Sequence, residues 1–600
     1  MKQNHPIFKW LFKSSHVLFI SVVMIIFGSY TRTIVPLFYK YATDYIIKPD
    51  PETHINLPKY ITTFIETGNG ILGKLFLVGV TLVLLQLIRA ISMFLSGWLS
   101  AKYSDDIAYK IRTSLYNHIQ NLSYSYHNKA ETGDLIQRST SDVETIRRFV
   151  GSQLPEIFRI VFLFIFVLIQ MIAINTLLTL ISLIVVPFIF VFAIFYFKKI
   201  QVIFTNTDES EAKMQTSLQE NLTGIRVVKA FAKEKYEIEK FDKLNRNYSD
   251  HIQDIIDNMA IYWSVSDLIC FLQIIATTVV GAILAIQGDI TVGDLFAFSS
   301  LVTMILWPIR QLGRIIGDLG KSTVAVKRIE EILNEPDEFQ EENLEKPEIK
   351  GNIEFNQVEF QFDDAQVPTL KNINLKINQG QTLAILGKTG SGKSTLAHLL
   401  VRLYDYTGGS IKIDGHELKE IDKKWIRRNI GIILQEPFLF SRSIYENIGI
   451  LAEQPSTDQV YNAAQIASIH EDIQNFEQGY ETLIGERGVT LSGGQRQRVA
   501  IARMLIKYMP ILIFDDSLSA VDTETDVQIR NALKNRSEKL TNIIITHRIT
   551  TAMEADQIIV LEDGKIIESG THASLIQSSR VYKNLWKIQN SVQMNDKGGE

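Results

Sequence analysis

Six stretches of the chain are long, apolar and nearly free of charged residues. A helix that crosses a bilayer core of about 30 Å needs about 20 mostly apolar residues, because lipid offers the backbone no hydrogen-bond partner. The hydrophobic pattern therefore predicts six membrane-spanning helices. They cover residues 17–39, 71–92, 154–174, 177–197, 262–286 and 292–309, and only Asn175 and Thr176 separate the third from the fourth.

Basic residues indicate on which side of the membrane the loops lie. Lys and Arg crowd the loops after the second and fourth spans and are absent from the connections after the third and fifth. Since basic loops stay inside, both long loops and the N-terminus are predicted to be cytoplasmic. Each loop has about 60 residues, enough for two helices that prolong the spans. Residues 122–128 and 224–231 look like loop tips, although from the residues alone a solvated helix surface fits better.

Four charged residues fall within or at the edge of the predicted spans, where charge is costly and usually faces a cavity or a partner. Asp267 is the most suggestive for binding a cationic substrate, with Trp263 one turn earlier. The structural alternative is an ion pair with an arginine, or a position near the inner interface. Arg32, Arg89 and Arg310 are the other charged residues of this group.

Changes in composition suggest the domain boundaries, and 600 residues exceed a single hydrophobic core. Residues 1–16 predict an amphipathic helix on the membrane surface. The transmembrane domain is expected over 17–333, an acidic linker over 334–350, a soluble α/β domain over 351–588 and a polar tail over 589–600. A net charge of −5 gives no reason to expect nucleic acid.

A glycine-rich loop follows an apolar strand of the soluble domain and opens an apolar helix. In such a P-loop the backbone amides and the helix N-terminus surround phosphate oxygens. Lys393 is expected to reach the β and γ phosphates, and the Ser394 hydroxyl to ligate Mg2+. The nucleotide-binding residues predicted here are Gly387, Thr389, Gly390, Ser391, Gly392, Lys393, Ser394 and Thr395.

A second apolar strand, downstream of the P-loop, ends in Asp515 and Asp516. A P-loop ATPase places a carboxylate for Mg2+ at this strand end, and Asp515 fits that role, directly or through a bound water. Two acids after an apolar run also fit simple solvation of a strand end. Their position after a P-loop favours the metal site.

The run Leu-Ser-Gly-Gly-Gln at residues 491–495 begins another predicted helix. With it the chain resembles the ATP-binding cassette superfamily, over essentially all 600 residues, and in particular bacterial multidrug exporters and their eukaryotic B-type relatives. The resemblance implies an all-α six-helix transmembrane domain fused to an α/β P-loop NTPase domain. That domain would have a RecA-like core, an antiparallel β subdomain and a helical subdomain. The loop tips would be coupling helices that dock on cassettes.

The same resemblance assigns roles to further residues of this sequence. Residues 485–488 match the family's cross-domain loop, and residues 519–522 its D-loop. Phe362 takes the place of the aromatic residue that stacks on adenine, commonly tyrosine, and keeps the stacking face. The family's remaining motif positions are Ser492, Gly493, Gly494 and Gln495 of the signature, Gln435 of the Q-loop (also a Mg2+ ligand), Asp522 of the D-loop and the switch histidine His547.

One position departs from the family pattern. Members with a full hydrolytic site carry glutamate, which orients the attacking water, where this chain has Asp516, one methylene shorter. A misplacement of about 1 Å can cost about a hundredfold in rate, so this site is expected to be slow. Each ATP lies between one chain's P-loop and the other chain's signature. The intact signature therefore predicts a heterodimer whose partner has the glutamate; a homodimer in which aspartate suffices is the alternative.

The predicted function is ATP-driven export of amphipathic compounds of multidrug type by alternating access. ATP and Mg2+ are the expected cofactors. The expected partners are a second half-transporter, the lipid bilayer and a small amphipathic substrate, and no nucleic acid. The protein is expected to be multi-pass in the cell membrane with its ATP-binding domain in the cytoplasm. A homodimeric lipid or peptide exporter, or a non-transporting ATP-gated regulator of a membrane partner, stays open.

Overall fold

The computed structural model describes residues 15–47, 57–339, 344–485, 491–519, 521–534 and 539–596. The chain forms two compact units. The first comprises Met1–Gln120 with Ala130–Glu335, and the second comprises Asn121–Lys129 with Pro336–Glu600. The surface helix expected over residues 1–16 lies almost wholly outside the described residues. We describe each unit by itself.

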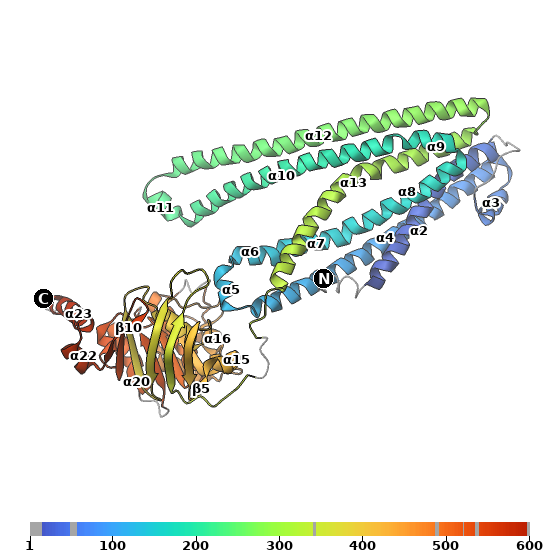
Figure 1. Cartoon of the computed structure of the whole chain (residues 1–600). Helices are drawn as coiled ribbons and strands as arrows, with labels where there is room; N and C mark the ends of the chain where they lie inside the picture. Colours follow the sequence, from blue (N-terminus) through green and yellow to red (C-terminus); the bar gives the residue numbers. More distant parts are fainter. Residues whose placement is uncertain are drawn as a thin grey trace. The chain divides into compact units, whose positions relative to one another are not determined.

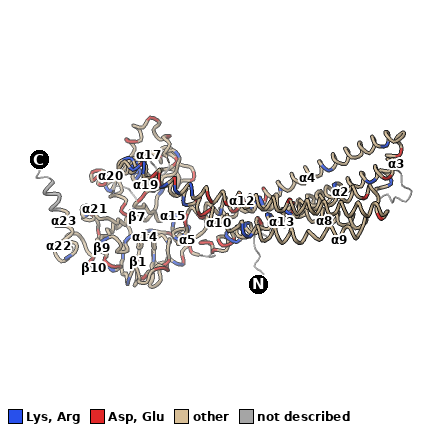
Figure 2. Tube along the Cα trace, turned by 90° about the horizontal axis from the view of Figure 1, so that it is seen from above, with Lys and Arg blue, Asp and Glu red and all other residues tan. Residues whose placement is uncertain are grey.

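Six helical segments of the first unit are long and apolar enough to cross a membrane, as predicted (Figure 1). Each expected span lies within one of them, and long stretches carry neither basic nor acidic residues (Figure 2). The segments are α2 (Ser15–Tyr41) with its π-helical continuation (Ala42–Ile47), α4 (Gly70–Gln120), α8 (Leu154–Ile174), α9 (Thr176–Leu183) with α10 (Val185–Thr223), α12 (Glu234–Gln287) and α13 (Val292–Leu333).

Several of these helices are much longer than a bilayer requires. The 51 residues of α4 span about 76 Å at 1.5 Å per residue, against a bilayer core of about 30 Å. Helices α10 and α12 run side by side and are joined by the short α11 (Ile225–Ala230) (Figure 1). The predicted stalks and a helix at the second loop tip are therefore present.

Short polar residues end or join the helices of the first unit. Asn175, between α8 and α9, accepts a hydrogen bond from the Leu178 amide at 2.9 Å and so caps α9. Between α2 and α4 the Ser21 hydroxyl hydrogen-bonds Ser100 at 2.8 Å and Ser96 at 3.1 Å. Small hydroxyl residues allow close helix approach in lipid, where apolar burial gives no net gain. The remaining α-helices of this unit are α3 (Lys59–Glu66), α6 (Thr132–Gln137) and α7 (Val143–Arg148), and the π-helical segments Arg138–Asp142 and Phe149–Gln153 join α6, α7 and α8 into one continuous segment.

The second unit contains a mixed six-stranded sheet in the order β10-β9-β3-β8-β7-β6. The five strands from β9 to β6 are parallel, and β10 joins the edge antiparallel. Parallel strands buried on both faces read as continuous apolar runs, as β7 does. Their bounds are β3 (Thr382–Gly387), β6 (Ile430–Ile433), β7 (Ile511–Asp515), β8 (Thr541–Ile545), β9 (Gln557–Glu562) and β10 (Lys565–Gly570).

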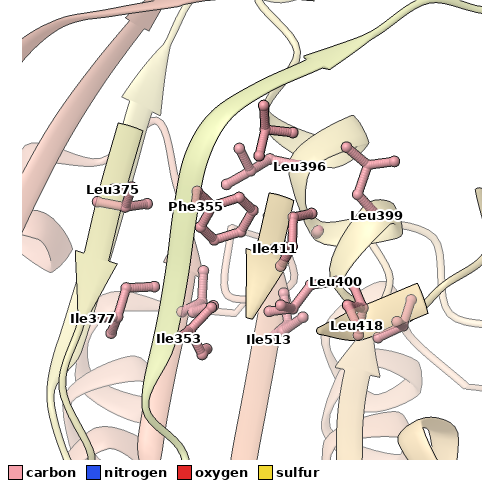
Figure 3. Close-up of a cluster of buried hydrophobic side chains, with 14 of the residues drawn as sticks. Ile353, Phe355, Leu375, Ile377, Leu396, Leu399, Leu400, Ile411, Leu418 and Ile513 are labelled. Carbon is pink, nitrogen blue, oxygen red and sulfur yellow. The ribbon is translucent and has the colours of Figure 1, made fainter. Parts of the chain in front are cut away.

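A four-stranded antiparallel sheet, in the order β2-β1-β4-β5, lies beside the first. Figure 3 shows the core between the two, where Phe355 and Ile411 of this sheet meet Leu396 of helix α14 (Lys393–Leu400) and Ile513 of β7. The core thus fixes the start of α14 against β7. The strands are β1 (Ile353–Phe360), β2 (Leu370–Ile377), β4 (Gly408–Ile413) and β5 (His416–Glu417).

A helical subdomain has its own apolar core, which also includes Ile433 and Phe514 at strand ends. The predicted combination of P-loop sheet, antiparallel sheet and helical subdomain is confirmed. Helix α23 runs to Asp596, so the boundary expected at residue 588 falls inside a helix. Besides α14, the α-helices of this unit are α5 (Tyr124–Lys129), α15 (Lys423–Asn429), α16 (Ile444–Gly449), α17 (Thr457–Ile466), α18 (His470–Gln474), α19 (Gly493–Leu505), α20 (Thr523–Lys534), α21 (Ile549–Ala552), α22 (His572–Ser578) and α23 (Val581–Asp596).

Candidate functional site

The glycine-rich loop lies between the end of β3 and the start of α14. Gly390 and Gly392 have φ of 81° and 100°, in the left-handed region that other residues rarely adopt. A Cβ on Gly392 would also lie 2.7 Å from Leu370 Cδ2. The loop therefore needs glycine at both positions to turn tightly into the helix.

Lys393 is the first residue of α14 and only 7% exposed. Its ammonium donates hydrogen bonds to the carbonyl oxygens of Gly387 at 2.9 Å and Lys388 at 2.8 Å. Burial lowers the pKa of Lys393, although the carboxylates of Asp516 and Asp515 act in the opposite direction. Two loop carbonyl oxygens and two nearby carboxylates thus stabilise the positive charge of Lys393 at the phosphate-binding motif.

Two hydroxyl groups of this loop fit a nucleotide and its metal ion. Ser391 Oγ is buried and has no hydrogen-bond partner among the described residues, as expected for a donor reserved for a phosphate oxygen. Ser394 Oγ donates to Asp515 Oδ1 at 3.0 Å. Burial raises the pKa of Asp515, and the Ser394 hydrogen bond partly offsets this. A hydroxyl beside a carboxylate is an oxygen donor set that suits Mg2+.

Asp516 follows the end of β7 with φ of 48°, a left-handed conformation at a non-glycine residue. Its amide donates to the Ile545 carbonyl at 3.0 Å, which continues the β7–β8 pairing through this residue. Gln435 Nε2 lies 3.5 Å from Asp516 Oδ2, and Asp516 Oδ1 is buried with no partner in the described chain. A strained backbone and an unpaired buried oxygen are features that cluster at functional sites.

His547 follows β8 with an exposed side chain. Gln589 of α23 fixes its backbone, because Gln589 Nε2 donates to the His547 carbonyl at 2.8 Å. Gln589 Oε1 accepts from the Ile549 amide at 2.9 Å. One side-chain amide therefore holds both sides of the loop that carries His547.

Arg548 connects this loop to the segment after β7. Its guanidinium donates to the carbonyl oxygens of Val521 at 3.0 Å and Ser519 at 2.7 Å. Asp522 caps α20 by accepting from the Thr525 amide at 2.9 Å and the Thr525 hydroxyl at 2.7 Å. These bonds, led by that from the Thr525 amide, lower the pKa of Asp522. Hydrogen bonds from Arg548 and from Thr525 thus hold the described D-loop residues in place.

The predicted signature forms the N-terminus of α19. Ser492 Oγ accepts from the Gln495 amide at 3.2 Å, and Gln495 Oε1 accepts from the Ser492 amide at 3.0 Å, which together make a capping box. Gln495 Nε2 and Arg498 both donate to the carboxylate of Asp472 in α18. The signature therefore belongs to the helical subdomain, and it presents a helix N-terminus that suits an anion.

Phe362 lies just beyond β1 in a group of aromatic rings. Its centroid is 4.7 Å from that of Phe360 and 5.2 Å from that of Tyr404, each edge to face. Tyr404 also meets Tyr124 of α5, at 5.4 Å. The first loop tip thus belongs to the same compact unit as the P-loop and contacts the ring next to Phe362.

Comparisons with known proteins cover both units. The family described as ABC transporter transmembrane region matches residues 18–309, and the one described as ABC transporter matches residues 370–519. A "Putative multidrug export ATP-binding/permease protein" of Staphylococcus aureus is 35% identical over 560 residues, 93% of this chain and 94% of that protein. The chain belongs to the ABC transporter family.

Two further similarities extend over most of this ABC transporter. An "Uncharacterized ABC transporter ATP-binding protein" of Bacillus subtilis is 35% identical over 509 residues, 84% of this chain and 87% of that protein. The structure of a bacterial Atm1-family ABC exporter with ATP bound has 25% sequence identity and a TM-score of 0.80, and the match covers 96% of this chain and 99% of that one. The transporter is thus a multi-pass membrane protein that couples ATP hydrolysis to export, and ABC exporters work as dimers.

In the transporter's membrane half, Asp267 and Trp263 lie on α12 and meet α13. The carboxylate of Asp267 pairs with the guanidinium of Arg310, which is the alternative raised from the sequence for Asp267. Trp263 lies beside the same guanidinium, 4.8 Å from ring centroid to Cζ. The pair does not exclude a substrate, because the Asp267 side chain is still 49% exposed.

Sequence reasoning missed several residues of the transporter's nucleotide site. Gln589 falls in the segment expected to be a polar tail, and nothing in its sequence context marks it. Arg548 contacts the D-loop and Tyr404 contacts Phe362, and only the folded chain creates these contacts. Glu486, Arg487 and Gly488 of the expected cross-domain loop, and Ala520 of the D-loop, lie outside the described residues.

Proposed function

We propose that this chain is one subunit of a heterodimeric ABC exporter that moves amphipathic compounds of multidrug type out across the cytoplasmic membrane. Its own P-loop site hydrolyses ATP slowly, and its signature helix completes a faster site on a partner that carries the glutamate. The cassette lies in the cytoplasm, consistent with the basic loops on that side.

The single observation that carries the asymmetry is the side chain after β7. Asp516 is one methylene shorter than the family's glutamate, and its hydrogen bond from Gln435 is long, at 3.5 Å. A base that cannot reach the attacking water loses rate steeply, since hydrogen-bond reach precedes pKa in importance. The signature at Ser492, by contrast, is intact and correctly capped.

The remaining site residues take roles that follow from their positions. Lys393 leaves the loop carbonyls to bind the β and γ phosphates, and Ser391 donates its unpaired hydroxyl. Phe362 stacks on adenine, and His547 contacts the γ phosphate. Ser394, Gln435 and Asp515 would hold Mg2+, which would supply charge neutralisation at the phosphates. Ser492 to Gln495 and Asp522 serve the partner's site across the dimer.

The two loop tips are proposed to transmit cassette motion to the spans. The ring of Tyr124 in α5 lies 5.4 Å from that of Tyr404, centroid to centroid. It also lies 5.9 Å from the ring of His398, which belongs to the P-loop helix α14. No residue of α11 is buried, and Val227 is 60% exposed. We propose that α11 docks on the partner's cassette. Closure of two cassettes on ATP then biases the spans toward the outward-open state, and hydrolysis resets them.

Co-purification of a tagged chain tests the heterodimer directly. A different half-transporter with glutamate after its own strand-end aspartate is the expected companion, and the pair is expected to hydrolyse ATP faster than this chain alone. Substrate-stimulated ATPase and vesicle uptake by the pair separate a pump from a regulator. Recovery of a fully active homodimer would overturn the asymmetric arrangement.

Asp516→Glu tests the weakened base. The substitution is expected to raise single-turnover hydrolysis at this chain's P-loop site about tenfold or more, because it restores the reach of the carboxylate. Asp515→Glu is the matched control: the same lengthening at the adjacent acid crowds the Ser394 contact and should lower the rate. An unchanged rate in Asp516→Glu would show that aspartate already suffices.

A further inference from the structure

Four side chains of α12 and α13 form a compact group in the membrane half, which we call the Arg310 cluster: Trp263, Asp267, Trp307 and Arg310. The guanidinium carbon lies 4.8 Å from the ring centroid of Trp263 and 5.4 Å from that of Trp307. Asp267 pairs with the same guanidinium. The two indoles are stacked, with centroids 6.0 Å apart and planes inclined by 24°. A carboxylate and two indole rings are the groups that bind organic cations.

The cluster lies at a defined depth in the membrane. Asp267 is 20 residues before Gln287, where α12 ends, and Arg310 is 18 residues after Val292, where α13 begins. At 1.5 Å per residue both lie about 27 to 30 Å from the connection between the two helices, which is about the thickness of the bilayer core. The cluster is therefore at the inner end of the spans, near one face of the bilayer core.

The surroundings of the cluster are firmly packed. Tyr262 is fully buried, donates from its hydroxyl to the Arg310 carbonyl at 2.8 Å and stacks on Tyr196 of α10 at 4.9 Å. A Cβ on Gly313 would lie 2.0 Å from the ring of Phe197 of α10, so only glycine allows this approach of α13. The packing holds the backbone carrying Arg310 in place.

Exposure within the cluster is unequal. The Arg310 side chain is 4% exposed, the Asp267 side chain is 49% exposed, and Trp307 is 56% exposed. A compound that approaches the cluster in the described chain meets a carboxylate oxygen and an indole face. The positive charge is behind them. Within the cluster, the exposed groups thus favour a cation, and the positive charge is the least exposed of the charged groups.

Arg310 itself uses the groups that such a cation would use. Its Nε is buried without a hydrogen-bond partner among the described residues, and its Nη2 donates to the Trp263 carbonyl at 3.4 Å. The Cys270 thiol is a further neighbour of the guanidinium. The two indoles and the Asp267 carboxylate are its electron-rich partners. An arriving cation and Arg310 compete for the same electron-rich surfaces.

We propose that the Arg310 cluster binds amphipathic organic cations and that Arg310 is its built-in competing cation, which keeps affinity low enough for release. The inference rests on the proposed exporter function and names the substrate class of one site. Asp267 and the indoles are binding residues, and Arg310 is a positioning residue that weakens their hold on a foreign cation. Its removal should therefore tighten binding rather than abolish it.

Binding of two ions with opposite charge and nearly equal shape, tetraphenylphosphonium and tetraphenylborate, tests the proposal. The full exporter pair in lipid nanodiscs is titrated with each ion by equilibrium dialysis, without nucleotide. Asp267→Asn is expected to weaken phosphonium binding about tenfold and not to weaken borate binding, because it leaves the Arg310 charge without its carboxylate partner. Arg310→Gln is expected to tighten phosphonium binding about tenfold, and the double variant should return near the wild-type value.

The sign of the Arg310→Gln effect is decisive. If the ion pair is purely structural, both substitutions should weaken the binding of both ions alike, and that outcome overturns the proposal. Trp307→Leu, at a half-exposed position, gives a second measurement if Arg310→Gln fails to fold: phosphonium binding should weaken about fivefold with borate unaffected. Equal loss for both ions would again reject the site.

Failure of this inference can be told apart from failure of the proposed function. If the wild-type pair exports amphipathic compounds while the Asp267 and Trp307 variants bind phosphonium normally, the exporter stands and the site is wrong. If the wild-type pair neither binds nor exports any amphipathic ion, the proposed function itself fails.

Discussion

The ring of Tyr124 meets the ring of Tyr404 edge to face, with centroids 5.4 Å apart and planes at 83°. Tyr404 meets Phe362 at 90° and 5.2 Å. A single tyrosine thus lies between the first loop tip and the residue proposed to stack on adenine. Because aromatic pairs lose energy when their geometry changes, we predict that a shift of Phe362 on nucleotide binding would reach α5 through Tyr404.

Tyr404→Ala is predicted to reduce the stimulation of ATP hydrolysis by the transported substrate. Loss of two edge-to-face contacts removes about 1 to 3 kcal/mol of packing between nucleotide site and loop tip. Substrate stimulation of ATPase activity should fall at least twofold, with ATP still bound. Tyr404→Phe is the control, since it keeps the ring and loses only the long 3.4 Å hydrogen bond from Asn128. Equal stimulation in both variants would contradict the relay.

Gln589→Ala is predicted to slow hydrolysis without weakening ATP binding. The substitution removes the two hydrogen bonds that hold the His547 loop, at 2.8 Å and 2.9 Å. Each is worth about 1 kcal/mol, so single-turnover hydrolysis at this chain's P-loop site should slow about fivefold or more while the affinity of that site for ATP stays constant. Lys587→Ala, at an exposed position of the same helix, should leave the single-turnover rate unchanged. Weaker ATP binding with an unchanged single-turnover rate would place Gln589 outside the catalytic step.

Lys40→Met is predicted to destabilise the membrane half where the end of α2 meets the start of α13. Lys40 pairs with Asp294 at 2.7 Å, and both side chains are nearly buried, at 12% and 10% exposed. Breaking such a pair leaves a buried charge and costs about 3 to 5 kcal/mol. The thermal unfolding midpoint should fall by several degrees. The control is Lys59→Met, at an exposed position, and an equal midpoint for both variants would show that the pair contributes little.

Local patterns predicted the elements correctly, and long-range contacts escaped prediction. The spans follow from hydropathy, and the α8–α9 turn from Asn175, because each depends only on neighbouring residues. The P-loop likewise needs only the order of strand, glycines and helix. The Asp267–Arg310 pair joins residues 43 apart, so the sequence could offer it only as an alternative. Gln589 reaches the His547 loop from a different helix, and no local signal marks such a contact.

Asp414→Asn is predicted to destabilise the cassette in a pH-dependent way. Asp414 accepts hydrogen bonds from the amides of Lys350 at 2.7 Å, Gly351 at 3.0 Å and Asn352 at 3.0 Å. Burial alone would raise the pKa of Asp414, but these bonds, together with one from the Asn352 side-chain amide at 2.8 Å, outweigh it and lower the pKa below its usual 3.8. The ionised form is thus favoured in the folded state.

A folded-state pKa below the unfolded value means that the stabilisation is fully present above about pH 4 and is lost as pH falls through the folded pKa. At pH 7 Asp414→Asn should lower the free energy of unfolding by about 1 to 3 kcal/mol, because the asparagine NH2 group is a donor and would face backbone N–H groups that are also donors. The difference in thermal unfolding midpoint between wild type and Asp414→Asn should therefore narrow as pH falls below about 4. The control is Glu453→Gln, at an exposed position, whose midpoint should equal that of the wild type at every pH. A gap of constant size from pH 7 to pH 3 would mean that shape, and not the charge of Asp414, holds these three amides.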